Sequence, residues 1–303
     1  MPKMKPHDLR GANRLLVDAT LGTTDMVDAV HASVLAWPRR NGRPLPLDRD
    51  PLAGSWPDAK PCVLVMVHGL CMNDLQWRQQ THDHGEALAR DLGCSVIHLH
   101  YNSGLRIDEN GRQLDRLLQA LAEAWPVRIE RMALIGHSMG GLVARAAIAA
   151  AQAEGHGWLA ALEAVVTLGT PYHGARLERA GHLLEHALGV SAHSAPFEAL
   201  GTMRSAGIRD LRHGGAHLHQ PPLPAHVRSY AVAGSMQAQP SAHGIRHPRG
   251  DGLVTVASAL GEHPDPRRRL PIPDARKQVV YGTGHIALLA SAPVHDRLRA
   301  WLA

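Results

Sequence analysis

The sequence RMALIGHSMGGLVARAAIAAA, residues 131–151, joins an apolar segment to an alanine-rich one through a serine set between glycines. The first segment is typical of a buried strand and the second of a helix. Gly136 and Gly140 stand two positions before and after Ser138. A sharp strand-to-helix turn needs small neighbours because its backbone is strained and closely packed. The stretch therefore predicts a G-x-S-x-G nucleophile elbow, with Ser138 as the nucleophile.

The segments around this elbow alternate between strand and helix patterns. Continuous apolar runs predict further strands at 62–67, 95–100, 163–169, 227–234 and 277–282, and helical spacing predicts helices at 108–125, 141–153 and 291–303. Such alternation is typical of an α/β fold, a mostly parallel sheet with helices on both faces. Ligands bind such sheets at the carboxyl ends of the strands, which is where Ser138 is expected.

A serine hydroxyl needs a base to become a nucleophile, and a histidine on the loop after the last strand would serve. Of the 22 histidines, His285 has that position, on a glycine-flanked loop. The carboxylate that orients this base should lie between Ser138 and His285 in the chain. Asp251, after the strand at 227–234, is the best candidate, and Asp210, before that strand, is its rival.

The tetrahedral intermediate of acyl transfer needs preformed N–H donors for its oxyanion. Met139 directly follows the nucleophile at the expected start of a helix. Leu70 follows the His-Gly pair at the end of the strand at 62–67. We therefore predict that the backbone N–H groups of Leu70 and Met139 form the oxyanion hole.

Five segments together resemble the landmarks of the α/β-hydrolase superfamily, specifically its lipase-like branch. They are VHGL (67–70), GHSMGG (136–141), LGTPYHG (168–174), DGLVTVASA (251–259) and GTGHIALL (282–289). The likeness is greatest to bacterial lipases and PGAP1-like lipid deacylases, and it spans residues 61–303. It implies an α/β-hydrolase fold without the first antiparallel strands and a Ser138–Asp251–His285 triad. It also implies hydrolysis of a carboxylic ester without a cofactor.

The chain divides into an N-terminal extension, residues 1–60, and a catalytic domain, residues 61–303. In the extension we expect a helix at 23–37 followed by a proline- and arginine-rich linker. The helix could pack on the main domain or touch a membrane surface. Residues 172–226 break the strand–helix alternation and predict a cap or lid insertion. Apolar cap residues could line an acyl pocket or form the cap's own core: Leu183, Leu184, Leu188, Val190, Phe197 and Leu200.

Composition narrows the remaining functional classes. The net charge of +5 is spread along the chain, and no nucleic-acid-binding module accompanies it, so no nucleic-acid partner is expected. The three cysteines show neither a disulfide framework nor a zinc pattern. The sequence starts without an apolar signal core and has no run long enough to span a membrane. A reducing, cytoplasmic setting is the resulting expectation.

Histidine-rich segments at 81–85 (THDHG) and 212–220 (RHGGAHLHQ) raise the question of a metal. Neither has a helical i, i+4 histidine pair with a glutamate or another set ligand spacing. We therefore expect solvated or hydrogen-bonded histidines there and no metal site.

The predicted function is hydrolysis of carboxylic esters, with lipid-like or aliphatic acyl groups favoured. Acyl transfer and thioester or amide cleavage use the same triad, and the sequence does not separate them. A protein of another class, a non-catalytic binding protein on a hydrolase fold, would usually lack a triad member. None is missing here.

Overall fold

The computed structural model describes residues 37–40, 43–44, 46–70, 72–175, 210–211, 221–238 and 250–303. The helix predicted before Trp37 lies outside these residues, as does most of the predicted cap, including its six apolar candidates. The described part contains an eight-stranded sheet and every residue predicted for the site.

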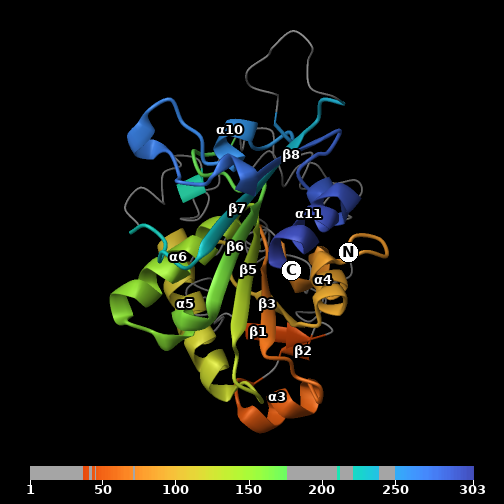
Figure 1. Ribbon diagram of the computed structural model, residues 1–303, viewed down its shortest axis with the longest axis vertical. Coiled ribbons are helices and arrows are strands. Elements are labelled where there is room, and N and C mark those ends of the chain that lie inside the picture. Colours follow the sequence, from red (N-terminus) through yellow and green to blue (C-terminus); the bar gives the residue numbers. More distant parts are fainter. Residues whose placement is uncertain are drawn as a thin grey trace, which may run out of the picture.

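An eight-stranded sheet forms the centre of the molecule, in the order β2-β1-β4-β3-β5-β6-β7-β8 (Figure 1). Its strands are β1 (Trp37–Arg40), β2 (Arg43–Pro44), β3 (Cys62–Val67), β4 (Ser95–His100), β5 (Arg131–His137), β6 (Leu162–Leu168), β7 (Arg228–Ser235) and β8 (Lys277–Tyr281). Strands β3 to β8 are parallel to one another, whereas β1 is antiparallel to both β2 and β4. The six predicted strands are all present within one residue of their expected bounds.

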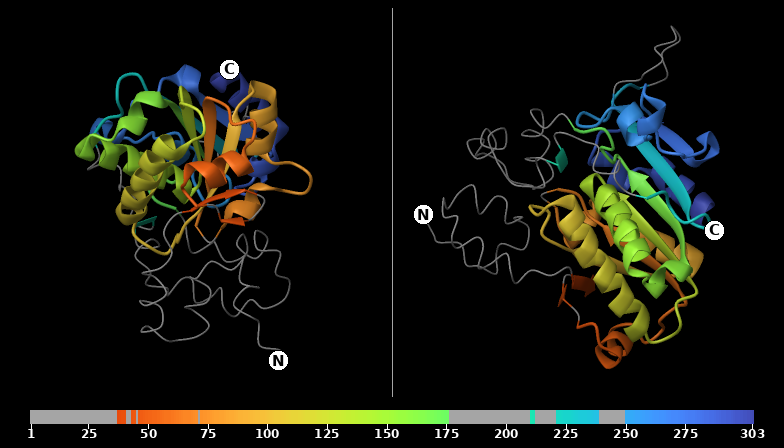
Figure 2. Two further views of the ribbon diagram at one scale, coloured as in Figure 1. Left: turned by 90° about the horizontal axis from the view of Figure 1, so that it is seen from below. Right: turned by 90° about the vertical axis from the view of Figure 1, so that its left-hand side faces the viewer.

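Helices cover both faces of the sheet. They are α3 (Arg49–Ser55), α4 (His84–Leu92), α5 (Ile107–Ala124), α6 (Met139–Glu154), α10 (Val256–Ala259) and α11 (Ala292–Leu302). Helices α5 and α6 lie together on one face, and α4 and α11 lie on the other (Figures 1 and 2). None of the helices in the described part of the chain combines the length and the apolar character needed to cross a membrane.

Strand β3 shows why its apolar run is continuous. Val63, Val65 and Val67 pack in the core beneath α5 and α6, whereas Leu64 and Met66 pack in the core beneath α4 and α11. In a strand that is buried on both faces, apolar residues do not alternate with polar ones, because neither face meets solvent. The aliphatic cores on the two faces fix β3, and with it the loop that carries Leu70.

The predicted linker before residue 61 is partly wrong. It contains β1, β2 and α3, and β1 joins the sheet with Trp37 opposite His100. The expectation that the first antiparallel strands are missing is therefore also wrong. The two strands are short and contain Pro38 and Pro44, and proline removes a backbone donor, so the pattern indicates a linker rather than a sheet.

The cysteine prediction is corrected as well, because Cys62 and Cys94 form a disulfide. Val63 pairs with Ser95 in the parallel register of β3 and β4, which brings the preceding residues side by side with their Cα atoms 4.7 Å apart. Because Cys62 and Cys94 are far apart in the sequence, their spacing alone does not predict that they lie side by side. Disulfides persist in oxidising compartments, so the argument from cysteines for a reducing, cytoplasmic setting no longer holds.

The disulfide gives a stability prediction. Replacing Cys62 and Cys94 together with alanine should lower the free energy of unfolding by about 3 kcal/mol, because the bond closes a loop with a sequence separation of 32. Urea unfolding of the oxidised protein measures the difference. Cys71→Ala is the matched control and should leave the disulfide intact by mass spectrometry. Equal stability of the double variant and the oxidised wild type would contradict a stabilising bond.

Candidate active site

Ser138 lies at the turn between β5 and α6 in a strained backbone conformation. Its φ of 53° and ψ of −125° are unusual for a residue with a side chain. Its N–H donates to the carbonyl of Leu168 at 2.8 Å, and its own carbonyl accepts from Thr170 Oγ1 at 2.9 Å. These two bonds to the end of β6 hold the strained residue in place. The predicted strand–turn–helix geometry around Ser138 is confirmed.

The glycines on either side of Ser138 are required by close backbone contacts. A Cβ on Gly136 would lie 2.5 Å from the amide nitrogen of Gly141, at the start of α6. A Cβ on Gly140 would overlap the carbonyl oxygens of Val67 and His68. The first turn of α6 therefore packs directly on the backbone of β5 and of the β3 end, which leaves no room for a side chain.

Asp251 and His285 form a buried pair. His285 Nδ1 lies 2.7 Å from Asp251 Oδ2, and the two residues are 2% and 0% exposed. The other carboxylate oxygen of Asp251 accepts from the N–H groups of Leu253 and Val254, at 3.0 and 2.8 Å. The His285 N–H also donates to the Asp251 carbonyl at 3.0 Å. Side chain and backbone thus both fix the imidazole relative to the carboxylate.

The charge state of this pair follows from its surroundings. Burial raises the pKa of Asp251, but the neighbouring His285 imidazole and the N–H groups of Val254 and Leu253 outweigh it and hold the pKa below its ordinary value. The carboxylate is therefore ionised near neutral pH and accepts the Nδ1–H proton of His285. This leaves Nε2 of His285 as the nitrogen with a free lone pair, the tautomer that a general base requires.

Gly169 connects the pair to the elbow. It follows Leu168, which accepts the Ser138 N–H. A Cβ at Gly169 would lie 3.0 Å from Asp251 Oδ2 and 3.1 Å from His285 Nδ1, and its φ of 59° also favours glycine. The end of β6 thus contacts both the Ser138 turn and the Asp251–His285 pair. Ser138, Asp251 and His285 all follow the carboxyl ends of parallel strands, β5, β7 and β8 respectively.

Both predicted oxyanion donors belong to segments that adjoin Ser138. Met139 is the first residue of α6, where helix N–H groups have no partner within the helix. Gly69 approaches Ser138 so closely that a Cβ on Gly69 would lie 3.0 Å from Ser138 Cβ, and Leu70 is the next residue. Their role as donors remains a prediction.

The rival carboxylate Asp210 serves another purpose. Its Oδ2 accepts from the Ile107 N–H at 3.1 Å, at the start of α5, and Oδ1 lies 3.6 Å from an Arg106 nitrogen. Its carboxylate therefore stabilises a helix N-terminus. Of the two candidates, Asp251 is the one that contacts His285.

Sequence analysis missed the supporting role of His68. Its Nδ1–H donates to the Gly69 carbonyl at 2.9 Å, and Nε2 accepts from the Tyr101 N–H at 3.3 Å. The Tyr101 hydroxyl donates to the His68 carbonyl at 2.6 Å, and the two rings stack. Burial lowers the pKa of His68 to about 3, so the ring stays neutral. His68 therefore braces the loop that carries Leu70.

The contacts of His137, the residue before Ser138, were also not predicted. Its Nε2–H donates to the His285 carbonyl at 3.1 Å, and the two rings lie 4.7 Å apart. Burial lowers the pKa of His137 to about 3. This contact ties the end of β5 to the His285 loop. The available signal was its place inside GHSMG, directly beside Ser138.

Comparisons with known proteins agree with the fold described above. A family model described as a PGAP1-like alpha/beta domain matches residues 60–196, which include Leu70 and Ser138. The mature form of Bacillus licheniformis lipase BlEst2 is 19% identical with a TM-score of 0.54, over 80% of this chain and 93% of that one. A search of curated proteins finds no match.

The likeness to this lipase shows that the chain has the α/β-hydrolase fold. The predicted fold class and resemblance are thereby confirmed. The propeptide form of the same lipase is 18% identical with a TM-score of 0.53, over 87% of this chain and 52% of that one. The chain thus spans about half the length of the propeptide form.

The close packing around Gly136 predicts that a single added methyl group at this position destabilises the protein strongly. Gly136→Ala should lower the free energy of unfolding by about 2 kcal/mol or more, because the new Cβ meets backbone that cannot move independently. Gly157→Ala is the matched control, since a Cβ there has no atom within 4 Å. Urea unfolding measures both variants. Similar losses in both would show that backbone contact is not the reason for Gly136.

Proposed function

We propose that this protein is a serine hydrolase that cleaves carboxylic esters, with Ser138, His285 and Asp251 as its catalytic triad. The observation that carries the proposal is the buried 2.7 Å pair between Asp251 and His285 beside a strained serine turn. A neutral imidazole held by an ionised carboxylate is the arrangement that activates a serine hydroxyl. The strained backbone at Ser138 also supports a functional role, because such strain lowers stability and is found mainly at functional sites.

The first half of the proposed reaction forms an acyl-enzyme. His285 Nε2 takes the Ser138 hydroxyl proton as Oγ attacks the ester carbonyl carbon. The Leu70 and Met139 N–H groups stabilise the resulting oxyanion. When the tetrahedral intermediate collapses, the ester C–O bond breaks and His285 returns its proton to the departing alkoxide.

The second half regenerates the enzyme. His285 Nε2 removes a proton from water as the water oxygen attacks the acyl carbon, and the same N–H groups again stabilise the oxyanion. Collapse breaks the bond to Ser138 Oγ, which recovers its proton from His285, and the acid leaves. Asp251 stabilises the imidazolium of both halves and remains ionised.

The proposed substrate class is lipid-like or aliphatic esters. The match to a PGAP1-like domain and the fold shared with a lipase support it. The predicted acyl-pocket residues of the cap, and the predicted membrane contact of the N-terminal helix or the cap, lie outside the described residues. Acyl transfer to an alcohol or thiol needs only that this acceptor replace water, so product analysis distinguishes it from hydrolysis.

Labelling by a fluorophosphonate probe tests the nucleophile without any guess about the substrate. Wild type should be labelled, and Ser138→Ala should lose the label completely because the reacting oxygen is removed. Gel fluorescence and intact mass measure the adduct. Detergent micelles are added to the wild type as a second condition that opens a closed lid. A folded wild type that stays unlabelled in both conditions would favour the non-catalytic binding protein.

Hydrolysis of p-nitrophenyl esters of increasing chain length gives a measurable kcat. Comparing this kcat between variants tests whether Asp251 or Asp210 is the carboxylate of the triad. Asp251→Asn should lower kcat by about 10⁴, because the imidazole loses the partner that sets its tautomer. Asp210→Asn, the matched control, should retain kcat because Asp210 contacts the start of α5. Nearly full activity in Asp251→Asn would overturn this assignment of the triad.

A further inference from the structure

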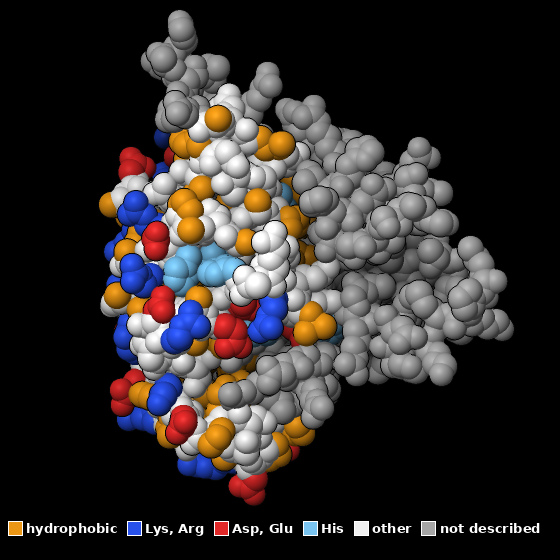
Figure 3. Space-filling model, turned by 90° about the vertical axis from the view of Figure 1, so that its right-hand side faces the viewer, with side chains coloured by type: hydrophobic (Ala, Val, Ile, Leu, Met, Phe, Trp, Pro, Cys, Tyr) orange, Lys and Arg blue, Asp and Glu red, His pale blue; other side chains and the backbone are white. Residues whose placement is uncertain are grey.

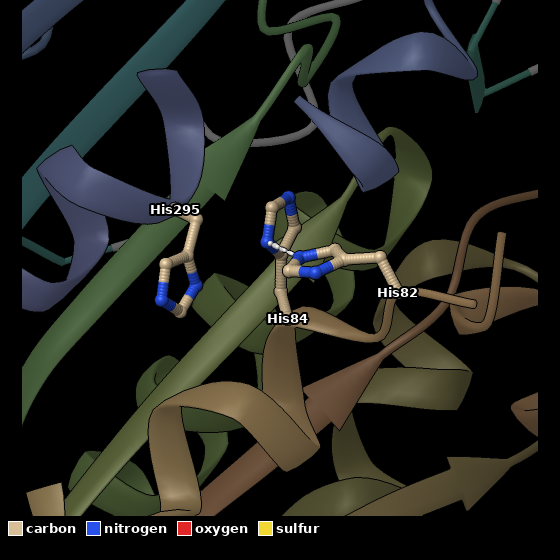
Figure 4. A group of neighbouring side chains, drawn as sticks. All are labelled: His82, His84 and His295. Atoms are coloured by element: carbon tan, nitrogen blue, oxygen red, sulfur yellow. Dashed lines mark hydrogen bonds between the residues drawn. The ribbon is translucent and has the colours of Figure 1, made fainter. Parts of the chain in front are cut away.

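Three histidines gather on the face of the molecule formed by α4 and α11, away from the pair made by Asp251 and His285. Figure 3 shows histidine side chains side by side at the surface of this face, and Figure 4 shows His82, His84 and His295 turned toward a common space. One ring nitrogen of each lies within 4.8 Å of one ring nitrogen of each of the others. They come from the loop before α4, the first residue of α4 and the middle of α11.

One ring nitrogen of His84 forms a hydrogen bond to the backbone, and the other faces His82. The His84 ring is buried, and its Nε2–H donates to the Leu288 carbonyl at 2.9 Å. Nδ1 therefore carries a lone pair, which accepts the His82 Nε2–H at 2.8 Å.

His295 has the same division of roles. Its Nε2 donates to Asp91 Oδ2 at 3.0 Å. Its Nδ1 is buried and has no hydrogen-bond partner among the described residues. A carboxylate behind one histidine nitrogen and a free lone pair on the other is the usual outer support of a metal-binding imidazole. A buried acceptor without a partner otherwise costs stability.

His82 is presented by a tight turn. Gln79 and His82 exchange two backbone hydrogen bonds, at 2.9 and 3.0 Å, and Gln80 between them has a positive φ of 55°. The turn fixes the backbone of His82 while its side chain stays partly exposed. His82 can therefore shift its ring proton to Nδ1 and turn its Nε2 lone pair toward the other two rings.

We propose that His82, His84 and His295 bind one divalent zinc ion, with a water molecule as the fourth ligand. Three neutral imidazoles are a ligand set that zinc prefers, and a tetrahedral ion with Zn–N bonds of about 2.0–2.1 Å holds its nitrogens about 3.3 Å apart. His82 and His84 would separate slightly, and His295 would approach. Asp83 is not the fourth ligand, because its carboxylate contacts His98 and caps α4.

The location of the ion gives it a structural role. Leu288, which accepts from His84, lies three residues after His285, and its N–H donates to the Gly284 carbonyl. A zinc ion would thus join α4, α11 and the loop that carries His285. The proposal concerns the stability of this junction and does not depend on ester hydrolysis.

Zinc titration of the tag-free protein against a chromophoric chelator tests the site. The expected result is one equivalent of zinc with a micromolar or lower Kd, together with a higher thermal unfolding midpoint when zinc is present than with EDTA. Absence of binding at micromolar zinc in the folded protein would overturn the proposal.

Single-residue variants locate the ion. His82→Ala and His295→Ala should each weaken zinc binding at least 30-fold, and Asp91→Asn about 10-fold, because it removes the support behind His295. His226→Ala is the matched control, since its ring contacts only the Leu159 carbonyl among the described residues, and its Kd should not change. Circular dichroism confirms that each variant is folded. An unchanged Kd in the His82→Ala/His295→Ala double variant would place the zinc elsewhere and refute this site.

Discussion

The structure of the site depends on the close approach between the first turn of α6 and the backbone of β3 and β5. Gly136 and Gly140 permit this contact, because a Cβ at either position would overlap neighbouring backbone. The approach forces the chain to reverse within one residue, so Ser138 takes a positive φ and lies at the tip of the turn. The same approach brings the Gly69–Leu70 segment against Ser138. The packing that strains the serine thus also brings the proposed oxyanion loop to it.

Hydrogen bonds between different strand ends then assemble the rest of the site. Ser138 binds the end of β6, Gly169 lies against the Asp251–His285 pair, and His137 contacts the His285 carbonyl. The histidines at the ends of β3 and β5 are buried and neutral, which suits residues that brace loops. Asp251 remains ionised despite its burial because three donors share its oxygens. The ionised group that the proposed catalysis needs is in this way held within the Asp251–His285 pair.

Two further features stabilise the parts of the chain that carry these loops. The Cys62–Cys94 disulfide joins the start of β3 to the segment before β4, at the opposite end of the strand from Leu70. The His82–His84–His295 cluster lies where the C-terminal helix meets α4, and His84 already contacts Leu288 behind the His285 loop. With zinc, that contact would become part of a rigid junction. Both features involve residues that are distant in the sequence.

The sequence alone determined the features that depend on neighbouring residues. The elbow at Ser138, the six parallel strands and the position of His285 after the last strand follow from local patterns of glycine and apolar residues. Tertiary structure decided whatever depends on register and on long-range contact. It paired Asp251 rather than Asp210 with His285, joined Cys62 to Cys94 and added β1 to the sheet through a segment that contains proline. It also brought His295 to His82 and His84, because spacing along a chain does not specify which distant side chains the packing of two helices places together.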